Sequence, residues 1–292
     1  MTDTRAQVQV HGTLDPQSGH ARSRDWGGRR GLLLAGVCFL ASVSGCATSA
    51  STSNTDSRGE LITESDEPED RKRARIRTEL AAGYFEQGQT TVALDQIKQA
   101  LQADPNYAPA FSLRGLVYMR LNDFPLAEDS FRRALQINPK DPDSLQNYGY
   151  FLYQQGRYKE AVDVLRRALS SPLYTGQAKT LMTLGLCQLR MGQLSEAEGS
   201  FSRAYELDPA NPYAGFHLAQ LEFRRGELQR SQFVIRRLNN SEQANSESLW
   251  LGIKIERKLN NKLAVEQLAE QLKRRFPRSK EWAAYQRGAF DE

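Results

Sequence analysis

The sequence predicts an all-α fold, in which six helix pairs stack into a superhelical solenoid and a final helix caps the last pair. Three observations predict this fold. Residues 71–292 repeat with a period of about 34 residues. Each repeat has small residues where two helices would meet and large apolar residues between them, and proline or glycine where a helix would end. A single helix pair cannot bury its apolar face alone, so successive pairs stack on one another.

The unit that begins at Ala108 shows the pattern most fully. When Ala108 is counted as position 1, large apolar residues stand at positions 4, 11 and 24 and small residues at positions 8, 20 and 27: Phe111, Tyr118, Phe131, Gly115, Ala127 and Ala134. The small residues let the two helices approach closely, and the large ones fill the space between them. Pro139, at position 32, ends the second helix because proline disfavours helix at the residue before it.

The same pattern recurs along the chain. We expect six repeats, at residues 74–107, 108–141, 142–177, 178–211, 212–244 and 245–278. Four are strong and the last two are degraded, with Ser231 where alanine is expected in the fifth. Glycine stands at position 15 of four repeats, in the turn where we expect a positive φ: Gly88, Gly156, Gly192 and Gly226. After Pro277, a short segment is expected to cap the last repeat with Trp282 and Tyr285 facing inward.

The segment ahead of the repeats has the build of a secretory leader. Arg29 and Arg30 precede an uncharged apolar run at residues 31–43, and small residues follow it. This order is typical of a signal peptide. The run is shorter than the roughly 20 residues that a membrane-spanning helix needs. We therefore expect residues 1–45 to be a signal peptide.

The leader ends at Cys46, inside the sequence Val43-Ser44-Gly45-Cys46. This sequence resembles the lipobox of bacterial lipoproteins, in which the cysteine is acylated and becomes the new N-terminus. An ordinary signal peptide with an incidental cysteine is the alternative. The resemblance implies a membrane anchor of acyl chains on Cys46, and Ala47 in place of aspartate favours the outer membrane. Residues 46–70 are rich in serine, threonine and acidic residues, and we expect a flexible tether.

The composition of the remaining chain excludes several classes of protein. Without residues 1–45 it has 34 basic and 32 acidic side chains, a balance that argues against a nucleic-acid binder. Cys187 and His217 are then the only cysteine and histidine besides Cys46, too few for an internal disulfide or a His/Cys metal cluster. A Cys187–His217 nucleophilic pair is an enzymatic alternative, but both residues fall within helices of the repeats. We therefore expect that the protein is not an enzyme and that it binds no cofactor or metal ion.

The repeat pattern resembles the tetratricopeptide repeat, W-x₂-L-G-x₂-Y…A-x₃-F…P. In that family, positions 2, 5, 9, 12 and 13 of the first helices face a groove that binds partners. Many of these positions are apolar here: Leu116, Met119, Tyr150, Tyr153, Met182, Leu186, Leu189, Tyr213, Phe216, Phe223, Leu249 and Ile253. We therefore expect the groove to bind an apolar segment of another protein, as a helix or an extended strand. The alternative is that the solenoid buries this face itself.

Position 13 is basic in four of the six repeats: Arg120, Arg190, Arg224 and Arg257. A row of arginines along one groove edge would orient an acidic or carboxylate group of the partner. The alternative is solvated arginines at helix C-termini, where cations are favoured by the helix dipole.

A lipobox, a short tether and six such repeats, in this order, resemble the type IV pilus biogenesis lipoproteins of the PilF/PilW family. The likeness covers essentially the whole mature chain and includes NYGYFLYQQGRYKEAVDVLRRAL in the third repeat. It implies a pilotin, a monomeric outer-membrane lipoprotein that binds the pilus secretin and promotes its localisation and multimerisation. Two alternatives stay open: a lipoprotein adaptor that regulates cell-wall enzymes, and a subunit of the barrel-assembly machine.

Overall fold

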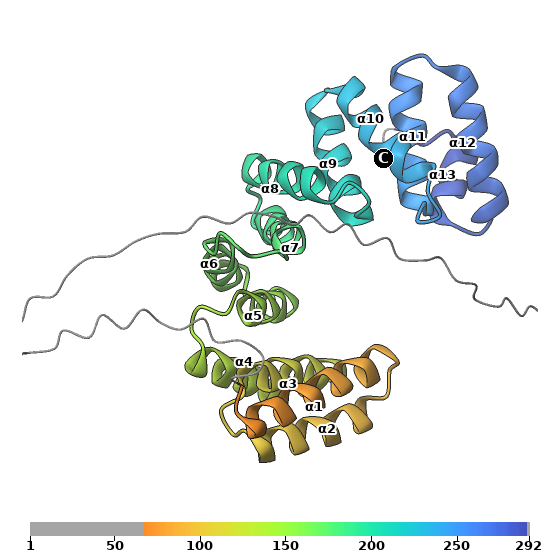
Figure 1. The fold of residues 1–292 in the computed structure, drawn as a ribbon. Helices are drawn as coiled ribbons and strands as arrows, with labels where there is room; N and C mark the ends of the chain where they lie inside the picture. The colour runs from red at the N-terminus through yellow and green to blue at the C-terminus, as the bar shows by residue number, and fades with distance from the viewer. Residues whose placement is uncertain (1–66, 291–292) are drawn as a thin grey trace, which may run out of the picture. The chain divides into compact units, whose positions relative to one another are not determined.

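The computed structural model describes residues 67–290, which form thirteen α-helices and no strand (Figure 1). The predicted signal peptide, Cys46 and the tether up to residue 66 lie outside the described residues. The helices are α1 (Glu69–Glu86), α2 (Thr90–Ala103), α3 (Ala108–Arg120), α4 (Phe124–Ile137), α5 (Pro142–Gln154), α6 (Tyr158–Leu169), α7 (Gln177–Arg190), α8 (Leu194–Leu207), α9 (Pro212–Arg225), α10 (Leu228–Asn239), α11 (Ser246–Lys258), α12 (Lys262–Arg275) and α13 (Lys280–Arg287).

The helices pack in chain order, as the predicted solenoid requires. Six pairs form, from α1 with α2 to α11 with α12, and the second helix of each pair contacts the first helix of the next. First helices also contact one another across repeats, as α1 with α3, α3 with α5 and α5 with α7. These contacts confirm the all-α tetratricopeptide solenoid and place the first helices side by side along one face.

The first helix is longer than the sequence predicts. It begins at Glu69, inside the predicted tether and ahead of the predicted first repeat. Its first turn contains acidic residues, which are stabilised by the positive end of the helix dipole. Arg75 pairs with Glu67 at 3.1 Å and with Glu79 at 3.2 Å, so the chain ahead of the helix is also held against it. The predicted boundary at residue 70 is therefore too late.

The small residue at position 8 lies against the large residue at position 24 of the same repeat. A Cβ atom added to Gly115 would stand 2.6 Å from Cε1 of Phe131. One added to Gly149 would stand 2.6 Å from Cδ2 of Leu165. Both large side chains are completely buried. Glycine at these positions therefore allows the two helices of a repeat to close on each other.

The turn inside every repeat contains one residue with positive φ. The four predicted glycines have φ between 74° and 80°. Asn122 and Asn260 take the same place in the second and sixth repeats, with φ of 60° and 58°. Asparagine tolerates this region better than most residues that carry a Cβ. The glycine pattern at position 15 does not include asparagine, so it did not predict these two turns.

The turn of the sixth repeat corrects its predicted register. Asn260 stands at position 15, so this repeat starts at Ser246 rather than at residue 245. Leu249 is then at position 4 and Ile253 at position 8, which are core positions, and both side chains are completely buried. Their assignment to the groove is wrong. The error arose because Gly252, a small residue, was aligned with position 8.

The last helix caps the sixth repeat. Ser279 accepts a hydrogen bond from the backbone N–H of Trp282 at 3.1 Å and starts α13. Trp282 and Tyr285 stack with ring centroids 5.4 Å apart and pack against a cluster that includes Leu249 and Leu272. The inward orientation predicted for these two aromatic residues is confirmed.

Candidate functional site

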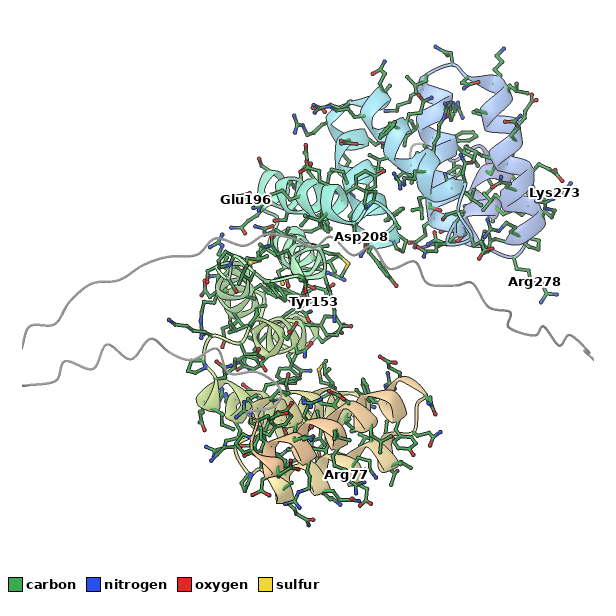
Figure 2. All side chains as sticks on the ribbon, viewed as in Figure 1. Arg77, Tyr153, Glu196, Asp208, Lys273 and Arg278 are labelled. Carbon is green, nitrogen blue, oxygen red and sulfur yellow. The ribbon has the colours of Figure 1, made fainter. Side chains whose placement is uncertain are left out.

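The predicted groove side chains lie on the first helices of the middle repeats, in a partly buried state. Tyr213 is 64% exposed. The others are half-buried: Leu116, Met119, Tyr150, Tyr153, Met182, Leu186, Leu189, Phe216 and Phe223. All of these except Tyr150 pack with one flank against the buried clusters of their repeats. The solenoid thus buries part of this face, and the remaining surface is apolar and accessible. In Figure 2, Tyr153 is labelled on α5.

Four of these side chains line one cavity of about 710 Å³: Leu116, Met119, Tyr150 and Met182. Phe85 of α1 and Phe124 of α4 extend its apolar lining. Among the described residues that line it, the charged ones are Arg120 and Lys179. A cavity of this size, with apolar walls and two cations, fits a few side chains of a bound polypeptide.

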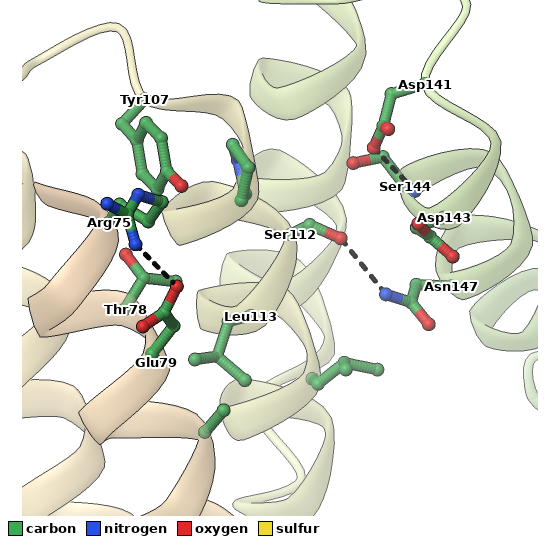
Figure 3. Close-up of a pocket in the computed structure, with 13 residues that line it drawn as sticks. Arg75, Thr78, Glu79, Tyr107, Ser112, Leu113, Asp141, Asp143, Ser144 and Asn147 are labelled. Atoms are coloured by element: carbon green, nitrogen blue, oxygen red, sulfur yellow. Dashed lines mark hydrogen bonds and ion pairs between the residues drawn. The ribbon is translucent and has the colours of Figure 1, made fainter. Parts of the chain in front are cut away.

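A second cavity of about 300 Å³ adjoins the first, since Leu116 and Asn147 line both. It lies between α1, α3 and α5, where polar side chains such as Arg75, Glu79 and Asp143 line it together with apolar ones such as Leu113 (Figure 3). Nδ2 of Asn147 donates to Oγ of Ser112 at 3.1 Å and joins α5 to α3. We call the two cavities together the groove. Both cavities combine hydrogen-bonding groups with apolar contact area.

The predicted arginines make different contacts from one another. Arg120 lines the larger cavity, and its guanidinium carbon lies 3.8 Å from the centroid of the Phe85 ring. It also donates to the backbone carbonyl of Phe85. Arg190 and Arg224 are exposed on α7 and α9. Of these three, Arg120 is thus already held in place beside the groove.

In the corrected register, the fourth arginine does not stand at position 13. Lys258 takes that position in the sixth repeat, and Arg257 stands at position 12. Arg257 lies 3.8 Å from the centroid of the Phe290 ring, next to the cap, while Lys258 lies 4.9 Å from that of Phe223. Position 12 also faces the groove in this repeat family, so the place of Arg257 on the groove edge stays a prediction.

Cys187 and His217, the pair that an enzyme would need, lie in the environment of core residues. Burial raises the pKa of the Cys187 thiol to about 12, so the thiolate is scarce at neutral pH. Burial also lowers the pKa of His217, whose ring stacks on Phe201 with centroids 5.1 Å apart. Within residues 67–290, no group of three or more His, Cys, Asp or Glu side chains is placed to hold a metal ion. No helix in this range is both long and apolar enough to cross a membrane.

Two aromatic residues that line the larger cavity, Phe85 and Phe124, were not predicted from the sequence. Phe85 stands at position 12 of the first repeat, so the rule for groove positions would have found it had it been applied to that repeat. Phe124 is the first residue of α4, the second helix of its repeat. The groove positions all lie on first helices, so the repeat pattern does not predict this contact.

The repeat geometry and the groove define a tetratricopeptide-repeat protein. The chain matches the family described as "Tetratricopeptide repeat" over residues 78–142 and 182–231. Residues 126–204 match the family described as "Anaphase-promoting complex, cyclosome, subunit 3". Proteins built from these repeats mediate contacts between proteins.

The similarity extends to particular relatives. The type IV pilus assembly protein PilF of Pseudomonas aeruginosa is 29% identical over 208 residues, which are 71% of this chain and 82% of PilF. The solved structure of Pseudomonas aeruginosa PilF aligns with a TM-score of 0.72 and 27% identity, over 76% of this chain and all of that one. PilW, a widely conserved type IV pilus biogenesis factor, aligns with a TM-score of 0.63 and 29% identity, over 73% of this chain and 97% of that one. The chain is a PilF/PilW-like tetratricopeptide-repeat protein.

Proposed function

We propose that the protein acts in type IV pilus biogenesis as a scaffold without catalytic activity, and that its groove binds a segment of another pilus protein. The observation that carries this proposal is the likeness to PilF and PilW in both sequence and fold. The groove supports it, because four apolar side chains from three neighbouring first helices line one accessible cavity.

The finer role that we propose is that of a pilotin for the pilus secretin. Cys46, in a sequence that resembles a lipobox, would anchor the chain to the outer membrane. The groove would hold a secretin segment until the subunits form their ring. Transport and assembly of this kind require binding and release, which a repeat scaffold performs without reaction chemistry.

Binding in the groove would be driven mainly by burial of apolar surface. A partner side chain that becomes fully buried contributes roughly 1.5–3 kcal/mol. Arg120 and Lys179 would favour an acidic or carboxylate group beside this apolar contact. Because Arg120 already stacks on Phe85, little side-chain entropy is lost when it binds.

Replacing Tyr150 and Met182 together with serine is expected to weaken partner binding by about 2–3 kcal/mol, at least tenfold, because two apolar contacts are lost. Co-purification with the secretin and the amount of secretin multimers in cells measure this effect. The matched control is Leu173→Ser, a 90% exposed side chain in the loop before α7, which should leave both unchanged. Unchanged multimers in a correctly folded double variant would contradict the groove assignment.

Replacing Cys46 with alanine is expected to release the protein from the membrane fraction, because the acyl chains have no attachment site. Outer-membrane secretin multimers should then fall sharply. Cell fractionation and immunoblotting measure both results. If the multimers still assemble in the outer membrane without the anchor, the pilotin role is wrong, although groove binding could still be tested by the double variant.

A further inference from the structure

Position 11 of the last two repeats is a buried glutamate, Glu222 in the fifth and Glu256 in the sixth. Glu256 is 1% exposed and has three side-chain partners. Nε of Arg236 donates to its Oε1 at 2.7 Å, while Gln232 and Asn261 donate to its Oε2 at 2.8 and 3.0 Å. Two of these partners come from α10 and one from the turn that follows α11. The buried charge is thus completely compensated.

Glu222 has no such compensation, although it is only 7% exposed and its Oε2 has no hydrogen-bond partner. The two repeats are equivalent at an offset of 34 residues, because their positive-φ turn residues Gly226 and Asn260 differ by 34. At this offset, the positions of Arg236, Gln232 and Asn261 correspond to Ser202, Glu198 and Glu227. The fifth repeat therefore has the buried carboxyl without any of its three nitrogen donors.

The neighbouring cations pair with other carboxyl groups. Arg225 of α9 pairs with Glu198 and with Glu227, both at 2.7 Å. Arg230 of α10 pairs with Glu227 at 2.9 Å. Around Glu222, three carboxyl groups thus face two guanidinium groups. The local charge lacks one cation, and the carboxyl without a partner is the buried one.

Open space lies where the missing cation would be. A cavity of about 430 Å³ between α8, α9 and α10 is lined by Ser202, Leu218 and Glu222, and Phe233 and the Glu227-paired Arg230 also border it. The ring of Phe233 is 72% exposed, although it is a large apolar side chain. The cavity shares no lining residue with the groove. It is therefore a separate site on different helices.

We propose that this cavity binds the guanidinium group of an arginine side chain from a partner protein. The guanidinium would occupy the place beside Glu222 that Arg236 occupies beside Glu256. A planar guanidinium can donate to a carboxylate and stack on an aromatic ring, and Phe233 offers that ring. Leu218 and Val234 would contact the aliphatic part of the side chain. The sixth repeat thus shows, within the same chain, the contact that the fifth repeat offers to a partner.

The protonation of Glu222 adds a pH dependence. Burial raises the pKa of its carboxyl, and Glu198 and Glu227 raise it further, to about 7, against the opposing effect of Arg230 and Arg225. Below pH 7 the group is mainly neutral and attracts a cation weakly. Binding of a guanidinium should therefore strengthen as the pH rises from 6 to 8.

The test uses the purified chain and ethylguanidinium chloride as the probe, with neutral ethylurea as its control. The amide NMR signals of Gln229 and Phe233 should shift saturably with the first compound and not with the second. Glu222→Gln should weaken binding about tenfold at pH 8. Glu196→Gln, an exposed acid on α8 outside the cavity, should bind as the native chain does (Figure 2).

A second variant fills the site from within the chain. Ser202→Arg should recreate the Arg236–Glu256 contact in the fifth repeat, abolish probe binding and raise the melting temperature at pH 8. It keeps Glu222, so the test does not depend on whether Glu222→Gln folds. Equal probe binding in Ser202→Arg, or no saturable binding in the native chain, would overturn the proposal. The groove variant Tyr150→Ser/Met182→Ser should bind the probe normally, which separates this site from the proposed pilus function.

Discussion

Replacing Phe131 with alanine is expected to lower the free energy of unfolding by about 4 kcal/mol. Its ring is completely buried and lies against Gly115, with centroids 5.6 Å from Phe151 and 6.0 Å from Tyr148. The substitution removes contacts inside the second repeat and between the second and third, so the neighbouring helices cannot easily close the cavity. Urea unfolding followed by far-UV circular dichroism measures the effect.

The control for this prediction is Phe233→Ala. It removes the same side chain from an exposed position on α10 and should change the free energy of unfolding by less than about 0.5 kcal/mol. A loss below 1 kcal/mol for Phe131→Ala would show that position 24 of the second repeat is not a packed core position.

Replacing Gly149 with valine is expected to destabilise the chain by about 3 kcal/mol, although valine has the higher helix propensity. A Cβ atom here would stand 2.6 Å from Cδ2 and 2.7 Å from Cγ of Leu165, so α5 and α6 would have to separate. Urea unfolding at neutral pH measures this loss.

Two variants test the cause of the Gly149 effect. Gly199→Ala, on α8 with no atom within 4 Å of the added methyl group, should raise the free energy of unfolding by about 0.5–1 kcal/mol. Adding Leu165→Ala to Gly149→Val should cost less than the two single effects combined, because the smaller side chain makes room. Additive costs would show that the contact between positions 8 and 24 is not the reason.

The fold was largely predictable because its contacts are local and repeated. Gly115 with Phe131 and Gly149 with Leu165 are separated by only 16 residues, and the same spacing recurs in other repeats. A pattern of this kind reports both helix boundaries and helix packing. The structure confirms the solenoid and the inward-facing aromatic residues of the cap.

The candidate site was less predictable, because exposure depends on register and on neighbours outside the repeat. An error of one residue in the sixth repeat moved Ile253 from a core position to a groove position. The contact between Arg257 and Phe290 depends on where the chain runs after α13, which the repeat pattern does not contain. Glu222 and Glu256 look alike in the sequence, and only the residues around them distinguish a satisfied carboxyl from an unsatisfied one.

Each repeat contacts the repeats next to it, and this affects the cooperativity of unfolding. In such a stack, stability is a sum of local terms, so one end can open while the other remains folded. A polypeptide seated in the groove would touch α1, α3, α5 and α7 at once. It would link the first four repeats into one block that opens as a unit, so binding of the partner would raise the melting temperature of those four repeats.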